Sequence, residues 1–321
     1  MTKSALITGV AGFIGSNLAD RLLADGWTVL GIDSFADFYD PAVKERNLRN
    51  ALADSRFRLI RKDLNEADLP AILDGVSVVF HQAAQAGVRS SWGREFHRYS
   101  ADNIMATQRL LEAIRGAGIE RTVLASSSSV YGNTTDLPVT EESLTKPHSP
   151  YGVTKLAAEH LARLYRRNFD LSIVTLRYFT VYGPRQRPDM AFYRLVQTAL
   201  DGGEFALFGT GDQTRDFTFV ADTVAANVLA AEADSPAEVY NIGGGARVSL
   251  RDAIRTIEDI TGRKITLKES GWQKGDVRDT WADCSRAEQE LGYRPGVPLR
   301  DGLERLVKWY ETHRNQAPKP A

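Results

Sequence analysis

The chain has 321 residues, of which 43% are hydrophobic and 25% are charged. This composition is ordinary for a folded protein that has a sizeable core and two domains or lobes, and it excludes a disordered or fibrous protein. Lysine and arginine number 40 against 41 aspartates and glutamates, which gives a formal net charge of -1. The overall charge therefore does not favour broad binding to nucleic acid or to an anionic membrane.

Cysteine content and hydropathy bear on where the protein acts. The single cysteine, Cys284, cannot form an internal disulfide. The first apolar stretch, "SALITG", is short and is interrupted by Gly9, so it is not typical of a signal peptide. No run approaches the roughly 18 apolar residues of a membrane span. We therefore predict a cytoplasmic protein that binds neither membranes nor nucleic acid.

The first half of the chain alternates between strand-like and helix-like segments. Residues 4–9 and 27–33 are typical of strands and residues 13–26 of a helix, which together make a βαβ unit. The alternation continues with predicted helices over 40–54, 96–116 and 150–168 and predicted strands over 57–63, 76–81, 121–127 and 171–179. Such regular alternation predicts an α/β fold with a doubly wound parallel sheet of the Rossmann type.

The character of the sequence changes near residue 178. The segment "TVYGPRQRPDM" is rich in proline, arginine and glycine, and we expect the later strands and helices to be shorter and less regular. We predict an NAD-binding Rossmann domain over residues 1–178 that also takes in about 214–242. The rest of residues 179–321 is predicted to form a smaller α/β substrate-binding domain.

A glycine-rich turn joins the first predicted strand to the first predicted helix. Gly9, Gly12 and Gly15 have GxxGxxG spacing, and such glycines let the backbone approach a pyrophosphate at a helix N-terminus. Asp33 ends the next strand, where a carboxylate can accept hydrogen bonds from ribose hydroxyls. Its charge would repel a 2'-phosphate, which favours NAD over NADP. The alternative for Asp33 is a helix or turn cap.

Two further strand ends are expected near the cofactor. "KDL", with Asp63 and Leu64, and "HQAAQAG", with Ala83 and Ala84, follow the third and fourth strands. We interpret His81 as a packed, hydrogen-bonded strand residue rather than a catalyst. None of the five histidines has a metal-ligand spacing, and one cysteine cannot form a soft-metal cluster, so no metal is expected.

A serine run and a Tyr-Lys pair are candidates for acid-base chemistry. "ASSSSVYG" (125–132) follows a predicted strand, where ligands bind in parallel sheets, although a loose turn is the alternative. Tyr151 and Lys155 are four residues apart and share a helix face. A phenol with a pKa of about 10 acts as a base near neutral pH only if that pKa falls by about 3 units. Lys155 and the positive nicotinamide ring are candidates for causing the fall.

These motifs together resemble the extended short-chain dehydrogenase/reductase family of nucleotide-sugar enzymes, over almost the whole chain. The family is similar in its glycine motif, in a serine ahead of "VYG" and in YxxxK. The resemblance implies that Ser127, Tyr151 and Lys155 form the catalytic triad and that Asn103 supports the active-site helix. The residues expected to bind NAD are Gly9, Gly12, Phe13, Ile14, Gly15, Asp33, Ser34, Asp63, Leu64, Ala83, Ala84, Asn103, Ser126, Tyr151, Lys155 and Tyr178.

The same resemblance implies arginine contacts to a UDP-sugar. Arg215 in "RDFTFV" and Arg278 in "GDVRDTWAD" match positions that hold the pyrophosphate and ribose, and bidentate geometry suits arginine to a diphosphate. Arg187 and Arg194 match positions that contact the UDP or the entering sugar, and Arg89 is expected near the site. Taken alone, each arginine would more often be a solvated surface charge.

The expected reaction follows from the residues beside the triad. Ser128 and Ser129 stand where dehydratases and decarboxylases of the family carry an acidic residue, which favours a plain epimerase. "AAQAGVRSSWG" and "LRYFTVYGPRQRPDMAFYRL" most closely resemble the UDP-glucuronate 4-epimerases, and Thr180 replaces the asparagine of related UDP-galactose 4-epimerases. We predict that Ser127, Ser128, Ser129 and Thr180 bind the sugar carboxylate. The alternative is that Ser128 and Ser129 only cap the strand end.

We therefore predict NAD-dependent conversion of UDP-glucuronate to UDP-galacturonate through a 4-keto intermediate, without decarboxylation. The alternatives are a UDP-glucose 4-epimerase, a UDP-glucuronate decarboxylase, and a cofactor-binding regulator that has lost the reaction. The resemblance also suggests a homodimer in which "NIMATQRLLEAIRG" and "KLAAEHLARLYRR" form a four-helix bundle. Apolar residues at this spacing are equally typical of a core-facing helix.

Overall fold

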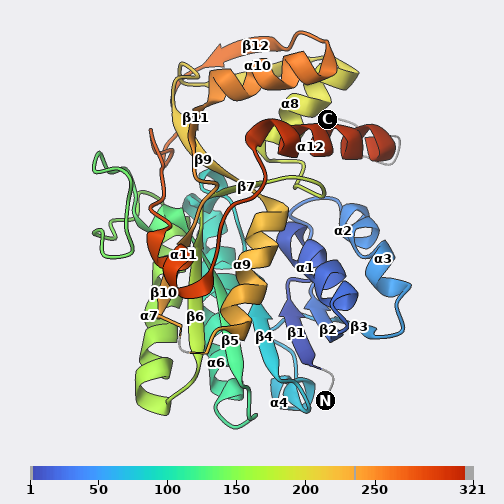
Figure 1. Cartoon of the computed structure of the whole chain (residues 1–321), viewed down its shortest axis with the longest axis vertical. Helices are drawn as coiled ribbons and strands as arrows, with labels where there is room; N and C mark the ends of the chain where they lie inside the picture. Colours follow the sequence, from blue (N-terminus) through green and yellow to red (C-terminus); the bar gives the residue numbers. More distant parts are fainter. Residues whose placement is uncertain (1–2, 235, 315–321) are drawn as a thin grey trace.

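A seven-stranded parallel sheet forms the centre of the molecule (Figure 1). The structure is a computed structural model that describes residues 3–234 and 236–314. The order of the strands is β10-β6-β5-β4-β1-β2-β3, and the doubly wound fold predicted from the sequence is confirmed. The strands are β1 (Ser4–Thr8), β2 (Thr28–Asp33), β3 (Phe57–Arg61), β4 (Val78–His81), β5 (Arg121–Ser127), β6 (Ile173–Tyr178) and β10 (Val239–Ile242).

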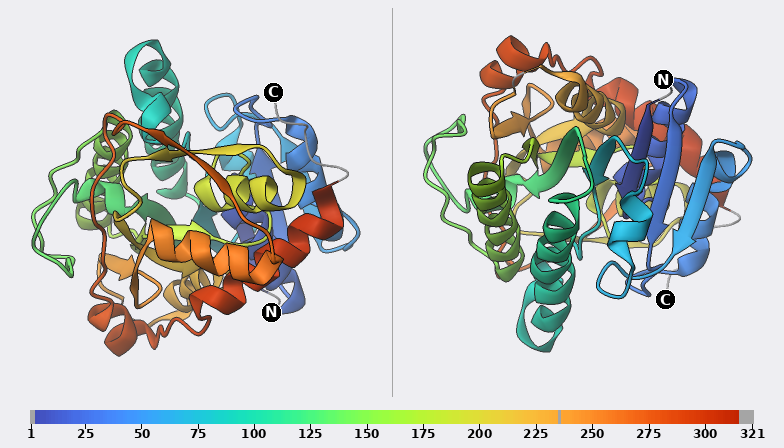
Figure 2. Two further views of the ribbon diagram at one scale, coloured as in Figure 1. Left: turned by 90° about the horizontal axis from the view of Figure 1, so that it is seen from above. Right: turned by 90° about the horizontal axis from the view of Figure 1, so that it is seen from below.

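Helices cover both faces of this sheet (Figure 2). The apolar residues of β1 alternate between the faces, as the period of a strand requires. Ala5 and Ile7 belong to the core that includes α1 (Phe13–Ala24) and α9 (Val220–Glu232). Leu6 belongs to the core formed with α4 (Leu69–Leu73) and α6 (Ala106–Ile114), and α7 (Pro150–Phe169) packs beside α6.

Three helical segments of this lobe differ from the sequence prediction. The helix expected over 40–54 divides into α2 (Pro41–Asn47) and α3 (Arg49–Leu52). The helix expected over 96–116 consists of α5 (Phe96–Ser100), a π-helical turn η3 (Ala101–Met105) and α6, while α4 was not expected. Buried side chains from these segments bond to distant backbone: Asn47 donates to the Ala11 carbonyl, and Asn103 donates to that of Gln85. Local periodicity does not reveal such contacts.

A second, smaller group of elements lies over the carboxyl ends of the sheet strands (Figure 1). It contains a three-stranded sheet in the order β11-β9-β7 and the strand pair β12-β8. The helices α8, α10 and α12 have 11, 12 and 15 residues against 12 for α1, so the expectation of shorter helices was wrong. The elements are β7 (Thr180–Tyr182), α8 (Ala191–Asp201), β8 (Glu204–Phe208), β9 (Thr214–Phe219), β11 (Arg247–Ser249), α10 (Leu250–Thr261), β12 (Thr266–Ser270) and α12 (Leu299–His313). Helix α11 (Ser285–Leu291) instead packs against β10 and α9 of the larger lobe.

The segment 214–242 is shared between the two groups. Helix α9 packs against α1, and β10 pairs with β6 at the edge of the large sheet, whereas β9 lies in the three-stranded sheet. We therefore propose to keep the division into two domains, with the first domain resuming after β9. Among residues 3–234 and 236–314, every helix is too short or too polar to cross a membrane.

Candidate active site

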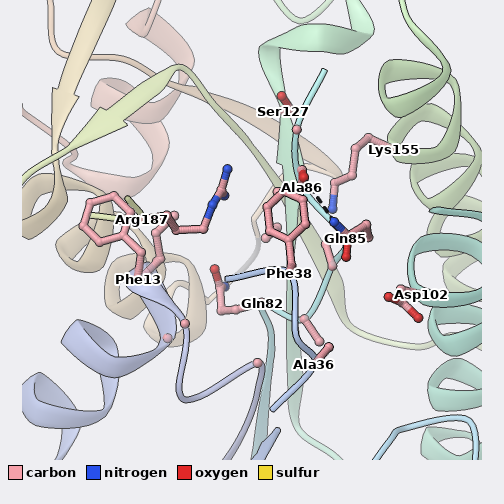
Figure 3. A pocket seen from close by; sticks show the side chains of 18 of the residues that line it. Phe13, Ala36, Phe38, Gln82, Gln85, Ala86, Asp102, Ser127, Lys155 and Arg187 are labelled. Atoms are coloured by element: carbon pink, nitrogen blue, oxygen red, sulfur yellow. Dashed lines mark hydrogen bonds between the residues drawn. The ribbon is translucent and has the colours of Figure 1, made fainter. Parts of the chain in front are cut away.

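A cavity of about 400 Å³ lies at the carboxyl ends of the sheet strands (Figure 3), a size typical of small-molecule sites. It brings together residues from the turn after β1 to the segment after β7. The residues expected from the sequence that line it are Gly9, Gly12, Phe13, Ile14, Gly15, Asp33, Ser34, Asp63, Leu64, Ala83, Ala84, Ser126, Ser127, Ser128, Ser129, Tyr151, Lys155, Tyr178, Thr180 and Arg187.

The glycine turn between β1 and α1 forms one end of the cavity. Gly9 has φ +68°, and a Cβ there would lie 2.7 Å from the Ala83 Cα. A Cβ on Gly15 would collide with the Gly9 carbonyl. Helix α1 begins after Gly12, and no side chain of the described residues caps it. The free N–H groups of its first turn and the helix dipole therefore fit the pyrophosphate of a dinucleotide.

Asp33 at the end of β2 makes contacts that support both interpretations of it. The side chain lines the cavity, and its oxygens also accept hydrogen bonds from the backbone N–H of Ala11 (3.0 Å) and of Phe35 (2.8 Å). The ammonium of Lys44, from α2, forms an ion pair with Asp33 at 3.2 Å and lines the same cavity. Lys44 offsets the charge of Asp33, so repulsion of a 2'-phosphate is weaker than the sequence indicated. No spacing in the sequence connects these two residues.

The serine run begins at the end of β5 and continues into a short 3-10 turn, η4 (Ser128–Val130). The Ser127 Oγ accepts from the Ser129 N–H at 3.1 Å, so it caps this turn, and the two hydroxyls are also 3.1 Å apart. Helix α7 begins close to the turn because Gly152 carries no side chain: a Cβ there would lie 2.6 Å from the Ser129 carbonyl oxygen. This packing brings Tyr151 to the serine run.

Burial determines the protonation of the groups around the Tyr-Lys pair. It raises the pKa of the Tyr151 phenol, and only partial relief comes from the nearby Ser127 hydroxyl and the Arg187 charge. Burial lowers the pKa of Lys155 to about 8, which the Glu159 carboxylate opposes. The groups that lower the Tyr151 pKa are therefore Ser127 and Arg187 rather than Lys155, contrary to the sequence-based expectation. His81 is buried and hydrogen-bonded, as predicted.

Five residues expected at the site lie outside the cavity lining. Asn103 is buried behind it, where its amide donates to Gln85 (3.0 Å) and to the Thr154 hydroxyl (2.9 Å), so it joins the segment after β4 to α7. The Arg194 guanidinium lies 5.6 Å from the centre of the Phe205 ring. The other three, Arg89, Arg215 and Arg278, gather at a loop of the smaller lobe.

That loop comprises residues 271–280 and follows β12. Arg89 forms a two-pronged ion pair with Asp276, at 2.7 and 3.2 Å. Arg215 donates to the carbonyls of Val277 (2.7 Å) and Arg278 (2.9 Å), so its own donors support the loop. The side chain of Arg278 is 76% exposed. Arg278 is therefore the arginine of this group whose charge is most open to a ligand.

The cavity also has lining residues that the sequence analysis missed. Asp102 is one of them, and burial followed by the charge of Asp63 raises its pKa. Gln82 and Gln85 belong to the quoted "HQAAQAG", and Phe179 and Met190 to "LRYFTVYGPRQRPDMAFYRL", so these motifs are the signal that could have found them. Lys44, inside α2, belongs to no motif. The missed lining residues include Ala36, Phe38, Tyr39, Lys44, Gln82, Gln85, Asp102, Phe179 and Met190. In the described residues no three His, Cys, Asp or Glu side chains are placed to hold a metal ion.

Figure 3 shows Ser127 and Lys155 near each other in the cavity, with Phe13 and Arg187 across from them. A parallel sheet with an uncapped glycine turn, an aspartate at the end of β2 and a Tyr-Lys pair beside a serine defines a dinucleotide-binding enzyme of the short-chain dehydrogenase type. The family model for GDP-mannose 4,6-dehydratase matches residues 6–306. The chain belongs to this family of extended short-chain dehydrogenases/reductases.

Individual relatives are similar over nearly the whole chain. An uncharacterised UDP-glucose epimerase of Bacillus subtilis is 49% identical, over 95% of this chain and 96% of its own length. A UDP-glucuronate 4-epimerase of Thermodesulfobacterium geofontis is 37% identical, with 95% of each chain covered. The crystal structure of UDP-glucuronic acid 4-epimerase from Bacillus cereus, in complex with UDP-glucuronic acid and NAD, is 44% identical with a TM-score of 0.94. It covers 96% of this chain and 99% of that chain.

Proposed function

We propose that the protein is an NAD-dependent 4-epimerase that converts UDP-glucuronate to UDP-galacturonate through a transient 4-keto sugar. One observation carries the proposal: Ser127, Ser128, Ser129 and Thr180 line the same cavity as the Tyr151–Lys155 pair. The positions that would hold an acidic residue in a dehydratase or decarboxylase are serines. The Bacillus cereus enzyme, which binds UDP-glucuronic acid and NAD, supports the proposal by its similarity.

Each part of the cavity has a proposed role in binding NAD. The first turn of α1 binds the pyrophosphate through its free N–H groups, and Asp33 accepts hydrogen bonds from ribose hydroxyls. Lys44 holds the Asp33 carboxylate in place from α2. NAD, when bound, supplies the hydride acceptor and donor. Asn103 supports α7 from behind through Thr154 rather than by contact with the cofactor.

Tyr151 is proposed to exchange the proton of the sugar's 4-hydroxyl. As a base it must be a phenolate, and burial in the protein alone disfavours that form. Positive charge in the cavity relieves this, and Arg187 already contributes in that direction. Ser127 lies close enough to lower the Tyr151 pKa, and we propose that it shares a hydrogen bond with the same sugar oxygen. We propose that Lys155 orients the bound ligands as an ammonium.

We propose that the hydroxyl cluster, formed by Ser127, Ser128, Ser129 and Thr180, prevents decarboxylation of the intermediate. The intermediate of a uronic acid is a β-keto acid. It loses carbon dioxide when the bond between carbon 5 and the carboxylate carbon lies parallel to the π orbitals of the 4-keto group. Within the described residues, the hydroxyls of Ser128 and Thr180 have no protein hydrogen-bond partner, so both are available to a carboxylate. Each hydrogen bond to a charged acceptor contributes about 1.5 to 3 kcal/mol. Several together hold the carboxylate out of that alignment.

Product analysis tests the function. We expect purified protein with UDP-glucuronate to yield UDP-galacturonate, identified by chromatography, and Tyr151→Phe to lower kcat by about 10²- to 10⁴-fold. Inversion by Tyr151→Phe at the original rate would exclude the proposed acid-base role.

Replacing Thr180 by valine tests the hydroxyl cluster. Loss of one carboxylate contact leaves the intermediate freer to reach the decarboxylating geometry, so we expect Thr180→Val to form UDP-4-keto-pentose at a yield per turnover about tenfold above wild type, since 1.4 kcal/mol is a factor of ten. Thr210→Val, in the loop after β8, is the control because Thr210 is outside the cavity lining. An unchanged yield in Thr180→Val would contradict this role.

The second candidate is a UDP-glucose 4-epimerase. The Bacillus subtilis relative, named for that substrate, favours it, and proton exchange by Tyr151 at the 4-hydroxyl does not require a carboxylate at carbon 6. The two candidates separate in a direct comparison of kcat/KM for UDP-glucuronate and UDP-glucose. A preference for the neutral sugar would support the second candidate. Formation of a UDP-pentose and carbon dioxide would indicate a decarboxylase. Absence of turnover would indicate a cofactor-binding regulator.

We also propose a homodimer formed by the outer faces of η3–α6 and α7. Met105, Val153 and Leu164 are 58%, 51% and 55% exposed on these neighbouring helical segments, which is unusual for large apolar side chains. A paired copy would bury them. The cytoplasmic location stays a prediction from the sequence.

A further inference from the structure

A buried ion pair lies directly behind the candidate active site. Glu159 is on α7 and Arg177 is on β6, and their side chains are 9% and 7% exposed. The Arg177 Nη2 donates to Glu159 Oε2 at 2.7 Å and its Nε donates to Oε1 at 3.0 Å. Neither residue lines the active-site cavity. Removing two charges from water is unfavourable unless further hydrogen bonds compensate, so the partners of this pair are informative.

The pair holds the ends of the two strands that carry site residues. The Ser126 Oγ donates to Glu159 Oε1 at 2.5 Å. Ser126 and Arg177 are register partners on the adjacent strands β5 and β6, and the next pair in the register is Ser127 and Tyr178. Because Ser126 and Arg177 each directly precede one of these two residues, fixing their side chains at Glu159 also fixes the adjoining backbone that presents Ser127 and Tyr178. Ser127 and Tyr178 line the cavity.

Arg177 extends the network to the turn after the serine run. Its Nη1 donates to the Tyr131 hydroxyl at 2.8 Å, and that hydroxyl donates to the Asn241 side chain at 2.6 Å. Tyr131 directly follows η4, and Asn241 lies on β10. One ion pair thus connects α7, β5, β6, β10 and the turn that carries Ser128 and Ser129.

Glu159 also acts on Lys155 from the next turn of the helix. Residues four apart on a helix lie on the same face, and Lys155 is only 5% exposed. Burial lowers the pKa of Lys155 to about 8, and Glu159 is the charge that opposes the shift. The other titratable groups near Lys155 are Tyr151, on the preceding turn of α7, and His81 on β4, and Tyr178 on β6 lines the same cavity. Burial raises the pKa of both tyrosines, and burial followed by the Lys155 charge lowers that of His81 to about 3, so all three are neutral near pH 8.

We propose that Glu159 is a positioning residue for the reaction: its carboxylate, held by Arg177, keeps the proton on the Lys155 ammonium and fixes the strand end that presents Ser127. This inference rests on the proposed epimerase function, because a reaction rate reports it. Glu159 is not among the residues that line the cavity, so it acts through Lys155, Ser126 and Arg177.

The experiment compares pH profiles of kcat for wild type, Glu159→Gln and the double variant Glu159→Gln/Arg177→Met. Glu159→Gln alone leaves the Arg177 charge buried without its partner, which could destabilise the fold. The double variant removes both charges and so keeps the experiment informative in that case. In both variants we expect the alkaline limb of the profile to move about one pH unit lower. Movement of the Lys155 pKa from about 8 to about 7 would reduce its protonated fraction at pH 8 about fivefold.

Two further variants complete the design. Glu238→Gln is the matched control, because Glu238 forms an ion pair with Arg163 of the same helix at 2.8 Å but on the surface. We expect its profile to match wild type. Ser126→Ala keeps both charges, so we expect it to lower kcat several-fold without moving the alkaline limb.

Opposite results would overturn the inference. An alkaline limb that stays in place in both Glu159 variants would show that Glu159 does not control the pKa of Lys155. An unchanged kcat in Ser126→Ala would show that the strand end does not depend on the bond from Ser126 to Glu159. NMR titration of the Lys155 side chain in wild type and Glu159→Gln measures the same shift without substrate. Absence of wild-type turnover would therefore reject the proposed function, while the titration would still decide this inference.

Discussion

At the scale of single residues, burial favours the neutral forms of Tyr151, Lys155 and His81. It raises the pKa of Tyr151, lowers that of Lys155 to about 8 and, with the Lys155 charge, lowers that of His81 to about 3. The protein alone therefore does not supply a phenolate. Charged ligands and Arg187 must supply the field that makes Tyr151 a base, which ties proton transfer to an occupied site.

His81 gives a test of burial that needs no ligand. The Thr107 hydroxyl donates to the Asn103 carbonyl (2.8 Å), so it accepts from His81 Nε2, and Nδ1 accepts from Thr8 (2.7 Å). The folded pKa of about 3 lies below the ordinary histidine value of 6.5, so the unfolded chain binds the extra proton between these values. The contribution of His81 to the free energy of unfolding is therefore fully present above pH 6.5 and falls as the pH is lowered toward 3.

The size of the pH effect on stability follows from the difference between the folded and unfolded pKa values of His81. Between pH 7.5 and 5.0 the His81 contribution falls by about 2 kcal/mol. Urea unfolding of wild type and His81→Gln at the two pH values measures it, and other groups cancel in the comparison. We expect the wild type to lose about 2 kcal/mol more than the variant. Equal losses would mean that His81 is not held neutral.

At the scale of elements, the start of α1 shows how a missing side chain positions a ligand site. Alanine stabilises a helix relative to glycine by up to about 1 kcal/mol. At Gly15, however, a Cβ would collide with the Gly9 carbonyl and lie 3.0 Å from the Val10 Cα. The contact with the glycine turn therefore outweighs the helix preference.

We expect Gly15→Ala to weaken NAD binding at least about tenfold. The glycine turn must distort to admit the methyl group, and a loss of more than about 1.4 kcal/mol of binding free energy is a factor of ten or more in affinity. Calorimetric titration with NAD measures the affinity. Gly116→Ala is the control, since a Cβ there meets nothing within 4 Å. Unchanged affinity in Gly15→Ala would show that the first turn of α1 does not form the pyrophosphate site.

At the scale of the whole molecule, the cavity is completed by residues from both lobes, while Arg278, which the sequence predicts at the UDP, lies on the loop 271–280. Arg278 is 76% exposed there and has no role in the cavity lining. We expect Arg278→Ala to raise KM for the UDP-sugar about tenfold or more while kcat changes little, because a lost charged hydrogen bond is 1.5 kcal/mol or about tenfold. Steady-state kinetics checks this, and a fall in kcat with constant KM would contradict it.

The proposed dimer is also a property of the whole molecule. We expect wild type to have twice the mass of one chain by light scattering, and Val153→Glu/Leu164→Glu to be a monomer because two carboxylates would be buried without partners. Leu52→Glu is the control, since Leu52 is 50% exposed on α3, which packs against β3 at the opposite edge of the large sheet from β6. A wild-type monomer, or a double variant that still dimerises, would reject the proposed helix face.

Particular residues show how far prediction from sequence reached. The glycine turn, Asp33, the serine run and the Tyr-Lys pair are local motifs tied to strand ends, and all of them line one cavity. Lys44 was missed because its link to Asp33 crosses from α2 to β2. Arg215 was expected at a diphosphate, but its donors hold the carbonyls of Val277 and Arg278, a contact between segments about 60 residues apart.

The sequence by itself determined the parallel sheet and the set of strand ends that carry chemistry, because alternation of strand and helix and the spacing of glycine, serine, tyrosine and lysine are local properties. Only the tertiary structure decided the electrostatics of the site. Burial raises the pKa of Tyr151, and Glu159, Ser126 and Arg177 meet only when α7, β5 and β6 pack together. Desolvation and charge pairing depend on neighbours in space, which the order of residues does not specify.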